Sequence, residues 1–300
     1  MERIDAGPGP ARGSRLFDLA DFMSRCVLLM DNGSLEPAST LQLREIAAEV
    51  EARIGVRVRP VSLAHSTQVS AEALGGRPAE LFEAALDHEL HSGTTEVFVV
   101  PLFIGPSHAI VRHVPAVVAE RHKLFPAASF GIASPLYIAG DLRLASILAD
   151  HIREHLDTEM NASQNAAAQP RVAIVDHGSP SRAVTEVRDR LTAQVRALLG
   201  DTVGEVTACS MERRPGPEFD FNEPTLDALL RRPSWNTSAV IVGMLFIGPG
   251  KHAGTGGNVW EICRHAHANT EQLRMTKLLG QHPLLIEILA DRARQVFAVS

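Results

Sequence analysis

The sequence predicts an α/β protein of two tandem domains, each with a four-stranded parallel sheet flanked by helices. The first observation is that short apolar runs alternate with amphipathic stretches along the whole chain, which is typical of a parallel sheet covered on both faces. The second is a repeat: Leu-Phe-Ile-Gly-Pro occurs at 102–106 and again at 245–249, and within three residues a histidine follows each copy, His108 and His252. We therefore interpret the chain as an internal duplication.

In the first copy we expect strands at 26–30, 56–63, 96–103 and 128–132, and helices at 37–54, 78–91, 111–123 and 141–156. The first strand is an uncharged apolar run that ends in Asp31-Asn32-Gly33-Ser34. The first helix begins at Pro37, which suits an opening turn. Its apolar residues recur at helical spacing, namely Leu41, Leu43, Ile46, Ala47 and Val50.

In the second copy we expect strands at 172–175, 203–210, 239–246 and 273–278, and helices at 181–199, 224–231, 258–268 and 283–297. Residues 157–170 are polar and alanine-rich without periodicity, as in a linker. The predicted domains are therefore 25–156 and 171–300. Residues 1–24 begin with a Gly- and Pro-rich stretch, which indicates a disordered tail.

The composition narrows the class of protein. The chain of 300 residues is 45% hydrophobic and 21% charged, as in an ordinary globular protein. A net charge of −6 and the lack of a basic block argue against nucleic-acid binding. The three cysteines are isolated, which argues against a zinc ribbon, an iron–sulfur cluster or disulfides and favours the cytoplasm. No apolar run approaches the roughly 18 residues of a membrane span.

Comparison of the two copies locates a candidate metal site in the second half. At three predicted strand ends the second copy has His177, Glu212 and His252, where the first has Asn32, Ala64 and His108. Carboxyl ends of parallel strands lie at one edge of a sheet, where ligands bind. Two imidazoles and a carboxylate that leave coordination positions open suit Fe, Co, Ni or Zn.

Simpler interpretations of these residues remain open. His252 could cap the next helix, His177 could set a tight turn, and Glu212 could be a solvated charge beside Arg213 and Arg214. Residues 248–257 are glycine-rich, but they lack the Gly-x-x-x-x-Gly-Lys-Ser/Thr order of a nucleotide-hydrolysing loop.

The motifs resemble one protein family. The sequence is similar to the class II chelatases of the CbiX and SirB type in three motifs. They are a strand followed by His177-Gly178-Ser179, then Leu-Phe-Ile-Gly-Pro-x-x-His, and then Pro-Leu-Leu-x-x-x-Leu-Ala-Asp-Arg from 283 to 292. The resemblance implies two flavodoxin-like domains facing each other across a cleft. It also implies insertion of Co²⁺, Fe²⁺ or Ni²⁺ into sirohydrochlorin without ATP, on the way to cobalamin, sirohaem or coenzyme F430.

The resemblance implies residue roles as well. His177 and His252 match the family's metal-binding histidines, and Glu212 matches an acidic residue that related chelatases use. On this hypothesis the macrocycle's carboxylates would meet Arg213, Arg214 and Lys251. Its apolar faces would contact side chains from a set of four, Met211, Phe219, Phe221 and Phe246. His108 would be either a facing base or a relic of the lost site, and no nucleotide or redox cofactor is implied.

Two other functions stay open at this point. The changed loop at 251–258 and the missing ligands of the first half favour a non-catalytic tetrapyrrole or metal carrier. A metal-dependent hydrolase is the other, although no oxyanion-stabilising motif supports it. Since both halves lie in one chain, we expect a monomer, with a homodimer as the alternative.

Overall fold

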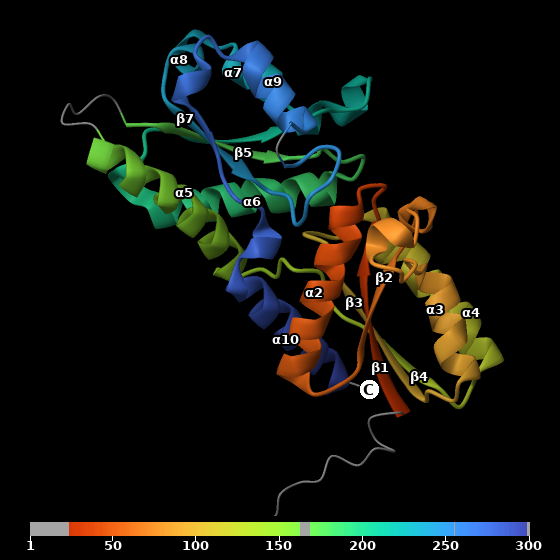
Figure 1. Ribbon diagram of the computed structural model, residues 1–300. Helices are drawn as coiled ribbons and strands as arrows, with labels where there is room; N and C mark the ends of the chain where they lie inside the picture. The colour runs from red at the N-terminus through yellow and green to blue at the C-terminus, as the bar shows by residue number, and fades with distance from the viewer. Residues whose placement is uncertain (1–23, 163–168, 255, 299–300) are drawn as a thin grey trace, which may run out of the picture.

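A computed structural model of the protein describes residues 24–162, 169–254 and 256–298. It contains two four-stranded sheets, one from each half of the chain, with helices packed on their faces (Figure 1). The strand orders are β2-β1-β3-β4 and β6-β5-β7-β8, so the two sheets have the same topology. The predicted fold class is confirmed. The tail expected at 1–24 lies, except for Ser24, outside the described residues.

Every strand pairing in the two sheets is parallel. The strands of the first sheet are β1 Arg25–Asp31, β2 Val58–Ser62, β3 Glu96–Pro101 and β4 Ser129–Ile132. Those of the second are β5 Arg171–Asp176, β6 Val206–Ser210, β7 Val240–Met244 and β8 Leu273–Met275. In each half the central strand is the first in sequence, so its carboxyl end lies in the middle of the sheet edge. No helix among the described residues combines the length and apolarity needed to cross a membrane.

The helices agree with the periodicity of the sequence apart from their ends and apart from the short α8, which was not predicted. In the first half they are α2 Pro37–Ile54, α3 Phe82–His91, α4 Val114–Leu124 and α5 Arg143–Ala162. In the second they are α6 Arg182–Leu199, α7 Leu226–Leu230, α8 Pro233–Asn236, α9 Asn258–Ala266 and α10 Pro283–Phe297. A π-helical turn, η3 Ala109–His113, precedes α4. Pro115 at the start of α4 has no N–H to donate, which favours a change of hydrogen-bond pattern there.

The two halves exchange their last helices. α5 packs on α6 and β7 of the second half, whereas α10 packs on α2, β3 and β4 of the first (Figure 1). The boundaries predicted at 25–156 and 171–300 therefore separate two sequence copies, but not two independent packing units. α5 also extends to Ala162, so helix reaches into the segment expected to be a linker, of which residues 163–168 lie outside the described part.

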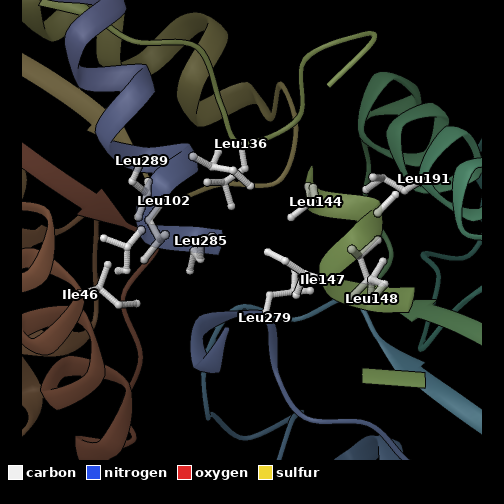
Figure 2. Packing of buried hydrophobic residues seen from close by; sticks show 14 of the residues in the cluster. Ile46, Leu102, Leu136, Leu144, Ile147, Leu148, Leu191, Leu279, Leu285 and Leu289 are labelled. Atoms are coloured by element: carbon white, nitrogen blue, oxygen red, sulfur yellow. The ribbon is translucent and has the colours of Figure 1, made fainter. Parts of the chain in front are cut away.

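One hydrophobic core runs through both halves. It joins Ile46 and Leu102 of the first half, Leu144 and Leu148 of α5, and Leu191 of α6 (Figure 2). Leu279, which precedes α10, and Leu285 and Leu289 within α10 complete it. Two smaller clusters cover the outer faces of the two sheets. Because the large core is continuous, it holds the two sheet edges in a fixed relative position.

Buried polar contacts also tie α10 to the first half. Arg292 is 2% exposed, and its guanidinium donates hydrogen bonds to the carbonyl oxygens of Pro135 and Leu136 at 3.2 and 2.8 Å. It also donates to Asp141 Oδ2 at 3.1 Å. Arg143 pairs with the same carboxylate, and its hydrogen bond, with that of Arg292, holds the pKa of Asp141 well below its usual value. The helix exchange is therefore stabilised by charge as well as by apolar packing.

Candidate metal site between the two halves

His177 is presented by a turn that only glycine can complete. β5 ends at Asp176, whose Oδ1 accepts the N–H of Gly178 at 3.1 Å. Gly178 has φ +91°, and a Cβ there would lie 2.0 Å from the carbonyl oxygen of Glu212. The carbonyl of His177 accepts the N–H of Glu212 at 3.3 Å, so the backbone fixes the two residues side by side.

The structure brings the three predicted ligands together at one sheet edge. His177 Nε2 lies 3.5 Å from Glu212 Oε1, and the rings of His177 and His252 are 4.6 Å apart between centroids, at 65°. The side chain of His177 is 48% exposed and that of Glu212 is 63% exposed, so an incoming ion can reach both. Within the described ranges, however, no three His, Cys, Asp or Glu residues are already arranged to hold a metal ion. The set is close but not preassembled.

The environment of His252 favours a neutral imidazole. Burial lowers its pKa, and the neighbouring His177 lowers it further. Its Nδ1 is buried without a hydrogen-bond partner. A neutral imidazole keeps the lone pair that binds a metal or accepts a proton.

A cavity of about 690 Å³ opens beside these side chains and is lined by both halves. The second half contributes His177, Phe246, Pro249, Lys251 and His252. The first half contributes polar groups from the equivalent sheet edge, including Asp31, Asn32, Ser34, Glu36 and His65. The volume lies in the range of small-molecule sites.

A second cavity of about 990 Å³ adjoins the first, and Gln42, Ile46 and Pro249 line both. Its wall is largely apolar, with side chains from α2, α9 and the β8 region, including Leu41, Trp260, Met244, Met275 and Leu278. Together the two cavities provide the kind of apolar surface that a flat macrocycle requires. Trp260 was not predicted from the sequence, although it lies three residues after the glycine-rich stretch.

Several predicted substrate contacts lie elsewhere. His108 is exposed at the start of η3 and does not line either cavity. Met211 is 5% exposed and packs in the core around β6, because its N–H continues the pairing with Asp176. Arg213 pairs with Asp220 and Glu223 of its own loop at 3.0 and 2.7 Å.

Aromatic contacts hold the same loop together. The Arg214 guanidinium lies 5.9 Å from the centre of the Phe219 ring, and that of Arg182 lies 4.7 Å from the centre of the Phe221 ring. These two phenylalanines, expected to contact a macrocycle, line neither cavity. Of the predicted substrate contacts, only Lys251 and Phe246 line the cavity beside the histidines.

Two first-half residues on this cavity were not recognised in the sequence. His65 follows the position equivalent to Glu212 and has φ +65°, an uncommon conformation for a residue other than glycine. Asp31 ends β1, and its Oδ1 accepts the N–H of Gly33 at 2.9 Å. The repeat of Asp-x-Gly-Ser in both halves was the available signal for Asp31.

Burial raises the pKa of Asp31 to about 6, and hydrogen bonds from Ser62 and Gly33 oppose this rise only in part. The folded protein therefore disfavours the carboxylate relative to the unfolded chain. We expect the free energy of unfolding to fall as pH rises from about 4 through about 6. Asp31→Asn should remove this loss and stabilise the protein at pH 7–8 by about 2–3 kcal/mol, at about 1.4 kcal/mol for each unit of pKa.

Urea denaturation of the unaltered protein and of Asp31→Asn at pH 4 and pH 8 measures this pH-dependent difference in the free energy of unfolding. The variant's gain should be large at pH 8 and small at pH 4. An equal difference at both pH values would contradict the assignment of the titration to Asp31.

The chain matches known proteins in part of its sequence and in most of its fold. Residues 26–155 match the sequence profile of the CbiX family. No curated protein matches the chain in sequence. The family match thus falls on the half that lacks two of the three ligand residues.

Solved structures match over nearly the whole chain. SirB from Bacillus subtilis with Fe³⁺ superposes with a TM-score of 0.64 at 15% identity, covering 91% of this chain and 95% of that one. SirB from Bacillus subtilis subspecies spizizenii in complex with cobalt gives 0.67 at 13% identity, with the same coverage. CbiX, described as the terminal enzyme of sirohaem biosynthesis in denitrifying bacteria, gives 0.60 at 18% identity and covers 90% and 98%.

These matches agree with the duplicated topology. The first half of the chain is therefore similar in sequence to the CbiX family, and the chain as a whole has the two-domain fold of the SirB and CbiX structures.

Proposed function

We propose that the protein inserts a divalent metal ion, Co²⁺, Fe²⁺ or Ni²⁺, into sirohydrochlorin or a closely related tetrapyrrole. The observation that carries this proposal is the gathering of His177, Glu212 and His252 beside a cavity lined by both halves. The structural relatives support the same class of substrate, since one was solved with Fe³⁺, one in complex with cobalt, and one is described as an enzyme of sirohaem biosynthesis.

In the proposed reaction the metal is a substrate, so the site must release it. Glu212 and one ring nitrogen from each of His177 and His252 would bind the ion weakly enough to pass it on. An open set of three donors leaves coordination positions for the ring nitrogens. The arrangement seen here, close but not preassembled, is consistent with a transient site.

The macrocycle would lie between the halves, with its apolar faces against Phe246 and the surface around Trp260. Lys251 lines the cavity beside the histidines.

 Among the described residues no ion pair within 4.0 Å involves Lys251, so we assign it to a carboxylate of the substrate. The assignment therefore rests on its place in the cavity and its lack of a partner.

Two pyrrole protons must leave as the metal enters. A neutral imidazole can take one of them once its bond to the metal is released. His252, whose pKa is lowered by burial, is suited to this role. No nucleotide takes part in the proposed reaction, and one chain supplies both walls of the cavity, so we propose a monomer as the working unit.

The experiment is to mix the protein with sirohydrochlorin and Co²⁺ or Fe²⁺ and follow the absorbance change of the macrocycle. We expect many equivalents of metallated product for each equivalent of protein, at a rate well above that of the mixture without protein. A reaction that stops at one equivalent, or that runs no faster than the mixture alone, would contradict the proposal.

The second candidate is a non-catalytic tetrapyrrole or metal carrier. It is favoured by the lack of a preassembled metal site in the described part of the chain and by the loss of two ligands from the first half. Titration would then show stoichiometric binding of the macrocycle or metal without turnover.

A further inference from the structure

We propose that Asp31 is a proton acceptor for the N–H groups of the tetrapyrrole, on the first-half wall of the cavity that also holds His177 and His252. This proposal deepens the proposed metal insertion and rests on it. It assigns a catalytic role to the half of the chain that lacks the metal ligands.

Asp31 and Asp176 are the same position in the duplication. Each ends the central strand of its sheet, and the Oδ1 atom of each accepts the N–H of the glycine two residues later, at 2.9 and 3.1 Å. The turn holds both carboxyl groups in one orientation. The two copies therefore differ in the surroundings of the carboxyl group, and not in how it is held.

In the second half a buried cation lies beside the carboxyl group and partly offsets the effect of burial, which still raises the pKa of Asp176. Arg188 is 2% exposed and lies 3.6 Å from Asp176 Oδ1. Its guanidinium also donates to Ser210 Oγ at 2.5 Å, and Asn222 completes this buried network. Asp176 is 7% exposed and does not line the cavity, so it is a structural group.

In the first half the cation is missing. α2 and α6 both have 18 residues, and they follow their aspartates at the same spacing, so Leu43 occupies the position of Arg188. No Arg, Lys or His forms an ion pair with Asp31 anywhere in the described ranges. Asp31 and Leu43 both line the cavity. The chain thus keeps a carboxyl group in the same turn, but without its counter-ion and open to a ligand.

This chemistry suits a base that works near neutral pH. Burial raises the pKa of Asp31 to about 6, so at pH 7 the group is mostly a carboxylate that gains a proton readily. In the proposed step the pyrrole N–H bond breaks, the O–H bond forms on Asp31, and the nitrogen lone pair binds M²⁺. The proton then leaves to water. The second proton goes to His252 after it releases the metal.

Other titratable or charged side chains face the same cavity, namely Glu36, His65, His177, Lys251 and His252. His65 is the competing acceptor on the first-half wall. It is exposed, and no hydrogen bond orients its ring, whereas Gly33 fixes Asp31 Oδ1. A fixed acceptor is the better base, because proton transfer requires a defined geometry.

The test is Asp31→Asn, which keeps the size of the side chain and removes the base. We expect kcat to fall by about 10²–10³-fold, with KM for the tetrapyrrole and the affinity for Co²⁺ changed less than about twofold. The acid limb of the kcat/KM profile near pH 6 should disappear. Asp31→Glu should recover part of the rate.

Leu43→Arg is the matched second variant, because it places beside Asp31 the cation that Asp176 already has. It should move the acid limb to lower pH without removing the carboxyl group. Circular dichroism shows whether this variant folds. If it does not fold, Asp31→Asn and Asp31→Glu still decide the question.

The outcomes separate the inference from the proposed function. If the unaltered protein shows no turnover, the proposed function fails. If it turns over and Asp31→Asn keeps both kcat and the acid limb, only the inference is overturned. A parallel loss of Co²⁺ affinity in Asp31→Asn would make Asp31 a metal ligand. Loss of the acid limb of the kcat/KM profile in His65→Gln, and not in Asp31→Asn, would assign the base to His65. Either result also overturns it.

Discussion

His252→Ala is expected to lose metal insertion by more than about 100-fold. Removal of residues that only support a metal ligand typically costs 10–100-fold in affinity or activity, so loss of a ligand itself should exceed that range. In the structure His252 is one of two imidazoles whose rings lie 4.6 Å apart beside the cavity. The absorbance change of sirohydrochlorin with Co²⁺ measures the rate, and Co²⁺ titration measures binding. His177→Ala should behave in the same way.

The matched control is His108→Ala, the equivalent position in the first half. His108 follows the same Leu-Phe-Ile-Gly-Pro sequence, but it is exposed and lines neither cavity. We expect it to keep most of the activity. Full activity in His252→Ala would contradict the assignment of the metal site. Equal losses of activity in His252→Ala and His108→Ala would indicate a site different from the one proposed.

Arg292→Ala is expected to lower the free energy of unfolding by about 3–5 kcal/mol, the usual cost of breaking a buried ion pair. The substitution leaves Asp141 without one of its two cations and two carbonyl oxygens, those of Pro135 and Leu136, without their donor. All three partners belong to the first half, whereas Arg292 lies near the end of the second. Urea denaturation followed by circular dichroism measures the loss.

Arg294→Ala, two residues further along α10, is the control. The Arg294 side chain is 48% exposed, and its ion pair with Asp291 is at the surface, so we expect a cost below about 1 kcal/mol. A double-mutant cycle of Arg292→Ala with Asp141→Asn should give a coupling energy clearly different from zero. Simple additivity would argue against the packing of α10 on the first half.

Much of the fold could be predicted from local patterns. The apolar run before Asp31 and the helical spacing after Pro37 identify β1 and α2, and the structure gives α2 the predicted bounds. The internal duplication also predicts the site, because it aligns His177 and Glu212 with first-half positions that hold different residues. The structure brings these residues together with His252, while their role as ligands stays a prediction.

The exchange of α5 and α10 could not be predicted in this way. The two helices come from equivalent positions in the duplication and have similar apolar faces. Periodicity therefore shows that one face of each helix is buried, but not which of the two sheets it packs on. The contacts that decide, such as Arg292 with Asp141, join residues about half a chain apart.

The role proposed for Asp31 depends on the lack, among the described residues, of a neighbouring cation, which only the three-dimensional structure shows. Burial raises its pKa, and Leu43 stands where the other copy has Arg188, on a helix that the sequence alone does not place beside it. Met211 shows the opposite error, since a residue next to a candidate ligand was expected at the surface but lies in the core.

The helix exchange has a consequence for the order in which the protein is completed on the ribosome. β1 to β4 emerge early, but α10, which packs on this sheet, is translated only after every strand of the second sheet. The second sheet receives α5 as soon as its own strands exist. The amino-terminal lobe is therefore finished after the carboxyl-terminal one, which reverses the usual order of domain folding during synthesis.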